Sequence, residues 1–285
     1  MAEFRYDEAF SRNLGWVTAS EQHRLRQARV ALAGMGGVGG VHLQTLARLG
    51  VGHFHIADLD TFELANFNRQ AGALVSTLGQ SKVEVLRRQV LDINPEAEVT
   101  VFARGIHPDN LDDFLRRVDV YVDGLDFFAF GARRAVFSAC QELEIPAVTA
   151  APLGMGAALL DFLPGSMGFE DYFGLEGCDE AEQALRLLVG LAPGMLHRTY
   201  LADRSRVDLR GRRGPSTVMA CQLCAGLAAT EVLKIVLGRG PLRPAPHGLQ
   251  VDAYRGRTVH TWRPGGHRHP LTRLALALAR RQLRG

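Results

Sequence analysis

The chain has 285 residues, of which 47% are hydrophobic and 22% are charged, so a sizeable folded core is expected and extensive disorder is not. The formal net charge of +3 is too small to indicate nucleic-acid binding by itself, although the C-terminal segment is locally basic. Four cysteines are too few for a disulfide framework, and the chain has neither a long uninterrupted apolar run nor an apolar N-terminal signal core. We therefore expect a cytoplasmic protein without a membrane partner.

Strand-like and helix-like segments alternate through the first half of the chain. Strands are expected at residues 29–34, 52–58, 98–104, 118–124, 146–151 and 157–163. Helices are expected at 20–27, 41–50, 81–93, 110–117 and 132–144. This alternation predicts an α/β fold with a Rossmann-like, doubly wound, mostly parallel sheet and helices on both faces. Ligands of such sheets bind at the carboxyl ends of the strands.

The pattern changes after residue 165. Residues 166–215 are acidic and glycine-rich, then helical, then basic, which favours a lid-like or crossover insertion. A long apolar helix is expected at 216–238, two paired strands at 248–254 and 258–264, and an amphipathic basic helix at 271–285. We therefore divide the chain into a nucleotide-binding core (1–165), a variable segment (166–215) and a C-terminal part (216–285) that completes the same domain.

A glycine-rich loop joins the first strand to the next helix. Gly34, Gly36 and Gly39 form the pattern G-x-G-x-x-G, which places a phosphate at the N-terminus of a helix. Asp58 follows the second strand, where a carboxylate can accept hydrogen bonds from a ribose. The pattern predicts a nucleotide site, and the simpler alternative is a tight strand-to-helix turn. It does not distinguish NAD from ATP.

Charged residues after the later strands favour a polyphosphate. Arg69 and Lys82 are two cations near the predicted nucleotide end of the sheet, and Asp126 is a carboxylate suited to Mg²⁺. Together they would neutralise the charge that develops when an α-phosphate is attacked. Each also has a plain structural alternative: the cations as solvated surface groups, Asp126 as a helix N-cap and Asn66 as a turn cap.

Several motifs in the same order extend this pattern. They are R5-Y6 with S11-R12-N13, GMGGVG (34–39), DLD (58–60), NFNRQ (66–70), GQSK (79–82), DINP (92–95), DGLD (123–126) and the later AATEVLKIVLG (228–238). In these motifs the chain resembles the ThiF/MoeB/HesA adenylyltransferases, which are relatives of the ubiquitin-activating enzymes. The resemblance covers residues 5–165 and the later helix.

The resemblance implies ATP and Mg²⁺ as cofactors. It implies that a carboxylate, usually the C-terminal glycine of a small ubiquitin-like or sulfur-carrier protein, attacks the α-phosphate and releases pyrophosphate as an acyl-adenylate forms. The implied nucleotide site consists of Gly34, Gly36, Gly37, Gly39 and Gln70, with Asp58 at the ribose, Asn66, Arg69 and Lys82 at the phosphates, and Asp126 at Mg²⁺. Arg12 matches an arginine that reaches the phosphates of a neighbouring subunit, so a homodimer is expected.

The chain departs from the family pattern at three places. Phe127 and Phe128 stand where the family usually has asparagine, so either the adenine edge is apolar or the next helix starts differently. Only one C-x-x-C pair is present, Cys221 and Cys224, and it lies in an apolar helix, so we do not expect zinc. Cys178 is a candidate acyl acceptor, although its acidic neighbours oppose formation of a thiolate.

Other functions remain open from the sequence. One is a non-catalytic scaffold with the same fold. Another is an NAD-dependent oxidoreductase, which the glycine loop and Asp58 allow but for which no acid–base set is evident. A third is an adenylyltransferase that activates a small carboxylate or one carried on RNA, although the basic C-terminal helix is explained equally well as a solvated face.

Overall fold

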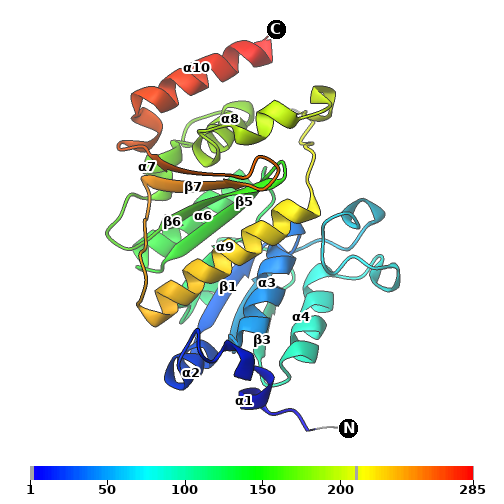
Figure 1. Ribbon diagram of the computed structural model, residues 1–285. Helices are drawn as coiled ribbons and strands as arrows, with labels where there is room; N and C mark the ends of the chain where they lie inside the picture. Colours follow the sequence, from blue (N-terminus) through cyan, green and yellow to red (C-terminus); the bar gives the residue numbers. More distant parts are fainter. Residues whose placement is uncertain (1–2, 209–210, 285) are drawn as a thin grey trace.

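The computed structural model describes residues 3–208 and 211–284, and it contains one eight-stranded sheet with helices packed on both faces (Figure 1). The strand order is β3-β2-β1-β4-β5-β6-β7-β8. Most strands and helices expected from the sequence are present within a few residues of their predicted ends. Gly285, the last residue of the expected C-terminal helix, lies outside the described residues.

The sheet divides into a parallel part and an antiparallel extension. The parallel strands are β1 (Arg29–Ala33), β2 (His53–Ala57), β3 (Glu98–Phe102), β4 (Val120–Asp123) and β5 (Ala147–Leu153). The antiparallel strands are β6 (Gly156–Phe162), β7 (His247–Asp252) and β8 (Arg257–Trp262). Since only two residues join β5 to β6, no crossover helix fits between them and the two strands form a hairpin. The prediction of a mostly parallel α/β sheet is confirmed.

Alternating side chains of the central strands produce two apolar layers. Val30 and Leu32 of β1 pack on one face, while Ala31 and Ala33 pack on the other. The first layer includes α3 (Gly37–Leu49), α4 (Lys82–Ile93) and α9 (Val218–Leu237). The second includes α5 (Leu111–Leu115), α6 (Phe130–Glu142), α7 (Phe169–Phe173) and α8 (Glu180–Leu191). The helices α1 (Tyr6–Ala9), α2 (Ala19–Gln27) and α10 (Pro270–Arg284) lie outside these two layers.

The helix α9 is long and apolar enough to cross a membrane by length and composition alone. Half of its apolar window is buried, and the helix packs along α3, β5 and β6 (Figure 1). Core helices of soluble proteins pass the same test. Its hydrophobicity is accounted for by its packing within the first apolar layer.

The segment expected to be lid-like consists of two different parts. In α7 and α8, Phe169, Phe173 and Leu187 are buried in the second apolar layer, so these helices belong to the folded core. The short 3-10 helices at Leu196–Tyr200 and Arg204–Arg206 follow them and lead toward α9. Only this later part keeps the largely exposed, basic character that the sequence suggested.

The connections between the parallel strands determine where a ligand-binding crevice can lie. The chain runs from β1 outward to β2 and β3, and then returns to β4 on the other side of β1. Ligands of open α/β sheets bind in the crevice at such a reversal, outside the carboxyl ends of the two strands. The glycine loop follows β1 there, and Gly124 follows β4.

Candidate functional site

The glycine loop is held tightly against the end of β4. Gly34 has φ of +86°, and its N–H donates to the carbonyl oxygen of Ala57 at 2.7 Å. A Cβ atom on Gly39 would lie 1.7 Å from the carbonyl oxygen of Gly34, and one on Gly124 would lie 2.5 Å from the same oxygen. The tight-turn explanation therefore accounts for Gly34 and Gly39 by backbone packing alone.

The other two glycines face side chains of the candidate site. A Cβ on Gly37 would lie 3.2 Å from Cys221 Sγ and 3.4 Å from Arg69 Cγ. A Cβ on Gly36 would lie 3.7 Å from Gln70 Nε2. Gly36 is the N-cap of α3, and no described side chain accepts a hydrogen bond from the first-turn N–H groups. These N–H groups and the helix dipole favour an anion at this position.

Asp58 fixes the loop to the turn that follows β2. Its Oδ2 accepts from Met35 N–H at 2.6 Å, and its Oδ1 accepts from Asp60 N–H at 2.8 Å. The structure therefore gives Asp58 a local role, since it joins two backbone segments that line the crevice. Contact with a ribose stays a prediction.

The loop after β2 brings Asn66, Arg69 and Gln70 toward the glycines. Asn66 Oδ1 accepts from Glu63 N–H at 3.0 Å, so the turn-cap alternative is realised. Arg69 Nη1 donates to Ala65 O at 3.0 Å while the stem of its side chain lies near Gly37. Gln70 is buried, and its Oε1 has no hydrogen-bond partner among the described residues.

Lys82 opens α4 and is buried, unlike the solvated cation of the structural alternative. Its Nζ lies 3.0 Å from Asp60 Oδ2, and its side chain is 7% exposed whereas that of Asp60 is 58% exposed. Asp60 therefore orients the ammonium group at the edge of the crevice. Sequence reasoning treated Asp60 only as part of a motif; its spacing after the strand was the available signal.

Asp126 lies in an exposed turn that a buried ion pair organises. Its Oδ1 accepts from Phe128 N–H at 2.9 Å, so it caps the turn before α6 with its carboxylate exposed to solvent. Arg133 Nε donates to Asp123 Oδ2 at 2.9 Å, and both side chains are buried. The remaining guanidinium nitrogens of Arg133 donate to the carbonyl oxygens of the same turn, at residues 125–127.

Arg133 was missed as a site residue from the sequence. In the sequence it follows the apolar pair Phe127 and Phe128, which suggested only an apolar adenine edge or an altered helix start. In the structure α6 begins at Phe130, one turn before Arg133, and the arginine reaches back beneath the turn. The partly buried rings of Phe127 and Phe128 contact each other edge to face, with centroids 5.0 Å apart. The side of the turn beyond Asp126 is therefore apolar.

Arg12 is not brought to the crevice within one chain. It is exposed in the 3-10 helix Ser11–Asn13, whose Asn13 Nδ2 donates to Leu49 O at 3.1 Å. Leu49 ends α3, and the glycine loop begins it. Because α3 has 13 residues, its two ends are about 20 Å apart. Any contact of Arg12 with bound phosphate needs a second copy of the chain.

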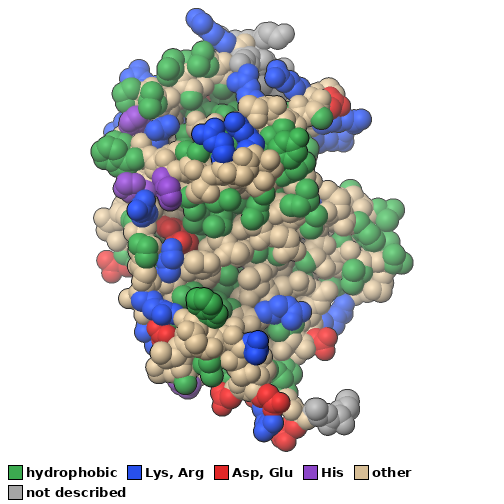
Figure 2. Space-filling view, in the orientation of Figure 1, with side chains coloured by type: hydrophobic (Ala, Val, Ile, Leu, Met, Phe, Trp, Pro, Cys, Tyr) green, Lys and Arg blue, Asp and Glu red, His purple; other side chains and the backbone are tan. Residues whose placement is uncertain are grey.

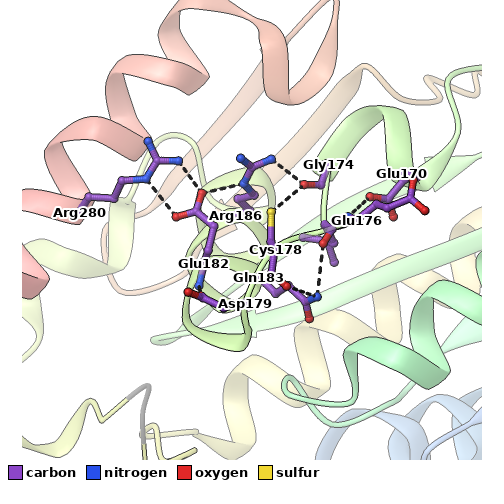
Figure 3. A network of polar contacts seen from close by, with 10 residues as sticks. Glu170, Gly174, Glu176, Cys178, Asp179, Glu182, Gln183, Arg186 and Arg280 are labelled. Carbon is purple, nitrogen blue, oxygen red and sulfur yellow. Dashed lines mark hydrogen bonds and ion pairs between the residues drawn. The ribbon is translucent and has the colours of Figure 1, made fainter.

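Cys178 lies in the turn between α7 and α8, within a network of charged groups (Figure 3). Its Sγ lies 3.6 Å from Gly174 O, which also accepts a hydrogen bond from Arg186. The neighbouring Glu182 carboxylate lies between Arg186 and Arg280. None of these contacts involves a residue of the glycine-loop crevice, so the structure does not join Cys178 to the candidate adenylation site.

Cys221 and Cys224 are buried on α9 and not arranged as a metal site. Burial raises the pKa of both thiols, and Cys224 is the more strongly affected. Among the residues described, no three histidine, cysteine, aspartate or glutamate side chains converge. Cys221 Sγ instead forms part of the wall beside Gly37.

The crevice fits a nucleoside polyphosphate on its own geometry. The N-terminus of α3 at Gly36 and Gly37 has no side-chain cap, and the stem of Arg69 packs beside it. Lys82 is held by Asp60 in the loop after β2. The buried Gln70 Oε1 without a partner supplies an acceptor at the same wall. The exposed carboxylate of Asp126 is a hard oxygen donor of the kind that suits Mg²⁺.

Comparison with known proteins gives relatives of one family. The chain is 33% identical over 145 residues to the tRNA threonylcarbamoyladenosine dehydratase of Haemophilus influenzae, covering 50% of this chain and 55% of that protein. It is 30% identical over 148 residues to the sulfur carrier protein ThiS adenylyltransferase of Escherichia coli, covering 52% of this chain and 58% of that protein. The matched region thus spans little more than half the length of these two relatives.

A solved structure agrees in fold. The crystal structure of E. coli MccB with ATP has a TM-score of 0.67 to this chain at 20% identity, over 93% of this chain and 73% of that one. At this identity the similarity shows the fold alone. A sequence profile of the ThiF family matches residues 10–274, which is most of the chain. The chain therefore belongs to the ThiF family.

Proposed function

We propose that this protein is an ATP-dependent adenylyltransferase that activates a carboxylate, namely the C-terminal glycine of a small ubiquitin-like or sulfur-carrier protein. The observation that carries the proposal is the N-terminus of α3, whose first-turn N–H groups have no described side-chain acceptor and lie beside the stem of Arg69 and the buried amide of Gln70. Membership of the ThiF family, whose relatives include an adenylyltransferase of a sulfur carrier protein, supports it.

In this proposal the glycine loop and the first turn of α3 bind phosphate oxygens through backbone N–H groups. Asn66, Arg69 and Lys82 complete the phosphate site, Gln70 belongs to the nucleotide site beside them, and Asp58 binds the ribose. The carboxylate oxygen of the substrate forms a bond to the α-phosphorus, and the bond to the bridging oxygen of pyrophosphate breaks. The two cations stabilise the negative charge that moves onto pyrophosphate.

Asp126 would hold Mg²⁺, which, when bound, supplies further neutralisation of the phosphate charge. The chain's own contribution is to keep this carboxylate in place. Arg133 does so through its hydrogen bonds to the carbonyl oxygens of the turn, while its pairing with Asp123 fixes the guanidinium. Asp126 thereby keeps an exposed position beyond the carboxyl end of β4, although it lies in a loop and not in a strand or helix.

We also propose a homodimer in which Arg12 of one copy completes the site of the other. Two observations support it. Arg12 is exposed and separated from the crevice of its own chain by the length of α3. The loop that carries Asn66 to Gln70 exposes Leu64 at 72% and Val75 at 81%, and Figure 2 shows hydrophobic side chains over the lobe at the right of the view. Contiguous exposed apolar patches of this kind mark protein–protein contact surfaces, so this one is suited to a second copy of the chain.

ATP–pyrophosphate exchange tests the proposed function directly. We expect exchange that depends on a small carrier protein ending in glycine and that collapses in Lys82→Ala and Asp126→Ala. Arg48→Ala serves as the matched control, since Arg48 is an exposed helical cation at the far end of α3. Exchange that persists in both site variants would remove the roles given to Lys82 and Asp126.

Three further measurements separate the alternatives. Calorimetric titration with ATP and Mg²⁺ that gives no heat of binding would favour a non-catalytic scaffold. Tight NADH binding without competition by ATP would favour an oxidoreductase. A small carboxylate, or a tRNA bearing one, is added in place of the carrier protein, because relatives of the chain include a tRNA threonylcarbamoyladenosine dehydratase. Exchange stimulated by either would keep the adenylation chemistry and change the substrate.

A further inference from the structure

A second cavity lies far from the glycine loop in sequence, between α8, α10 and the 3-10 helix Gly266–Arg268. Its volume is about 720 Å³, and it is open to solvent along one side. Five of its lining side chains are basic, and no acidic residue of the described chain lines it. These basic residues are Arg186, His267, Arg268, Arg273 and Arg280. No residue assigned to the nucleotide crevice belongs to it.

The charges at this groove are only partly balanced. Arg186 Nε donates to Glu182 Oε1 at 2.7 Å and Arg280 Nε to Glu182 Oε2 at 3.0 Å, so two guanidinium groups share one carboxylate (Figure 3). Arg268 lies 3.7 Å from an exposed Asp171 carboxylate. Arg273 takes part in no ion pair among the described residues. Four arginines thus face two carboxylates, which leaves an excess of two positive charges.

The helix α10 presents a row of exposed leucines beside the groove, and one of them, Leu274, lines it. Leu271, Leu274 and Leu278 follow the spacing i, i+3, i+7, and each side chain is more than half exposed. On its other side α10 is fixed, because Leu276 is buried against Leu185 and Val189 of α8. Figure 2 shows hydrophobic and basic side chains intermixed over the upper end of the molecule, where α10 lies. The row is therefore a rigid and unpartnered apolar surface with a cationic border.

We propose that the groove between α8 and α10 is a docking site for an acidic amphipathic helix of a partner protein. The apolar lining of the groove at Leu274, Leu276 and Ala277, continued at its edge by Leu271 and Leu278, would accept apolar side chains spaced by one helical turn, as in helix-in-groove recognition. The arginines beside it would pair with carboxylates on the flanks of the same helix, which sets its orientation and direction. A small anion or an RNA backbone would use the arginines and leave the leucines exposed. A flat lipid surface would not fill a concave groove.

The experiment uses the full chain and a fluorescein-labelled helical peptide with leucines at i, i+3 and i+7 and glutamates on both flanks. We expect saturable binding by fluorescence anisotropy, weakened at least tenfold by Arg273→Glu and by Leu274→Glu. Both side chains are exposed, so thermal unfolding is expected to show an intact fold. The matched controls are Arg48→Glu on α3 and Leu143→Glu directly after α6, both at exposed positions, and we expect them to bind as the unaltered chain does.

Charge reversal provides the sharper test. The same peptide with lysines in place of the glutamates is expected to bind poorly to the unaltered chain and at least tenfold better to Arg273→Glu. Absence of saturable binding overturns the proposal, as does equal binding of a glutamate peptide without leucines. Preferential binding of a single-stranded RNA or of phosphatidylglycerol vesicles that Arg273→Glu abolishes and Leu274→Glu leaves unchanged assigns the groove to a polyanion and overturns it too.

Discussion

Arg133 Nε donates to Asp123 Oδ2 at 2.9 Å, and this buried pair supports the turn that carries Asp126. Thr149 Oγ1 donates to the same Asp123 oxygen at 3.0 Å, so β4, β5 and α6 meet at one carboxylate. The other two guanidinium nitrogens donate hydrogen bonds to the carbonyl oxygens of residues 125–127. The pair therefore couples the position of the exposed Asp126 to the centre of the sheet.

Removing the cation of this pair is expected to be costly. Arg133→Met leaves the Asp123 carboxylate buried without its partner, and loss of one member of a buried pair costs about 3–5 kcal/mol. The double variant Asp123→Asn/Arg133→Met is expected to lose less, because no charge stays buried. Urea unfolding of the three proteins measures both values. A double variant less stable than Arg133→Met would show that the pair is not the source of the loss.

The glycine loop allows a matched pair of glycine substitutions. Gly39→Ala would place Cβ 1.7 Å from Gly34 O, so the loop must move and ATP binding is expected to fall at least tenfold. Gly226→Ala, in the middle of α9, meets no atom within 4 Å and is expected to stabilise the fold by about 0.5–1 kcal/mol. Calorimetric ATP titration and thermal unfolding give the two readouts. Unchanged ATP affinity in Gly39→Ala would contradict the proposed phosphate site.

The proposed homodimer predicts complementation between two inactive proteins. Arg12→Ala supplies an intact Lys82, and Lys82→Ala supplies an intact Arg12. In a symmetric dimer, random exchange of subunits restores about a quarter of the sites. Pyrophosphate exchange is therefore expected to reappear when the two variants are mixed. A mixture as inactive as its components would exclude the contribution of Arg12 to a second copy's site.

The buried carboxyl groups of Asp161 and Glu231 predict how stability changes as pH rises from about 4 to 8. Burial and the neighbouring Glu231 carboxylate raise the pKa of Asp161 to about 8. Folded Asp161 therefore keeps a proton that the unfolded chain has lost above about pH 4. The free energy of unfolding should fall as pH rises from about 4 to 8. Asp161→Asn, whose amide can donate to Glu231 at every pH, should remove this slope in urea unfolding. A slope that survives would place it on other groups.

His42 predicts the opposite dependence at acidic pH. It is buried in α3, neither ring nitrogen has a partner among the described residues, and burial lowers the pKa of the imidazole to about 4. The unfolded chain binds a proton there below about pH 6.5 while the folded one does not, so stability falls as pH decreases from 6.5 to 4. His42→Leu should flatten this part of the profile and add about 1–3 kcal/mol by removing unpaired polar atoms. Lower stability of His42→Leu at every pH would contradict it.

Local sequence patterns were sufficient for the parallel half of the fold. Apolar runs such as 29–33 and 120–123 are bounded by turn residues, and helical spacing separates them, so β1, β4 and the helices between them were predictable. The glycine spacing and the carboxylate at Asp58 likewise placed a nucleotide site at the ends of the strands. The roles of Arg69, Gln70, Lys82 and Asp126 stay predictions, because a motif identifies residue types and not the atoms that they contact.

Long-range contacts were beyond the reach of those patterns. Arg133 pairs with Asp123 because α6 starts at Phe130, which places Arg133 beneath the loop that follows β4. The core position of α7 depends on Phe137 and Phe162, whose rings lie 4.4 and 5.7 Å from that of Phe169. Neither contact follows from the composition of residues 166–215, which is why that segment was taken as lid-like throughout.

The sequence by itself determined the alternating α/β pattern, the family and the residue types available for phosphate binding, because these follow from short-range periodicity and motif spacing. Only the tertiary structure decided which of those residues meet. It brought Arg69, Gln70 and Cys221 to the glycine loop and buried Lys82 beside Asp60. It also left Arg12 at the opposite end of α3. The physical reason is that packing of distant elements on a sheet fixes side-chain distances, whereas spacing along the chain fixes only local conformation.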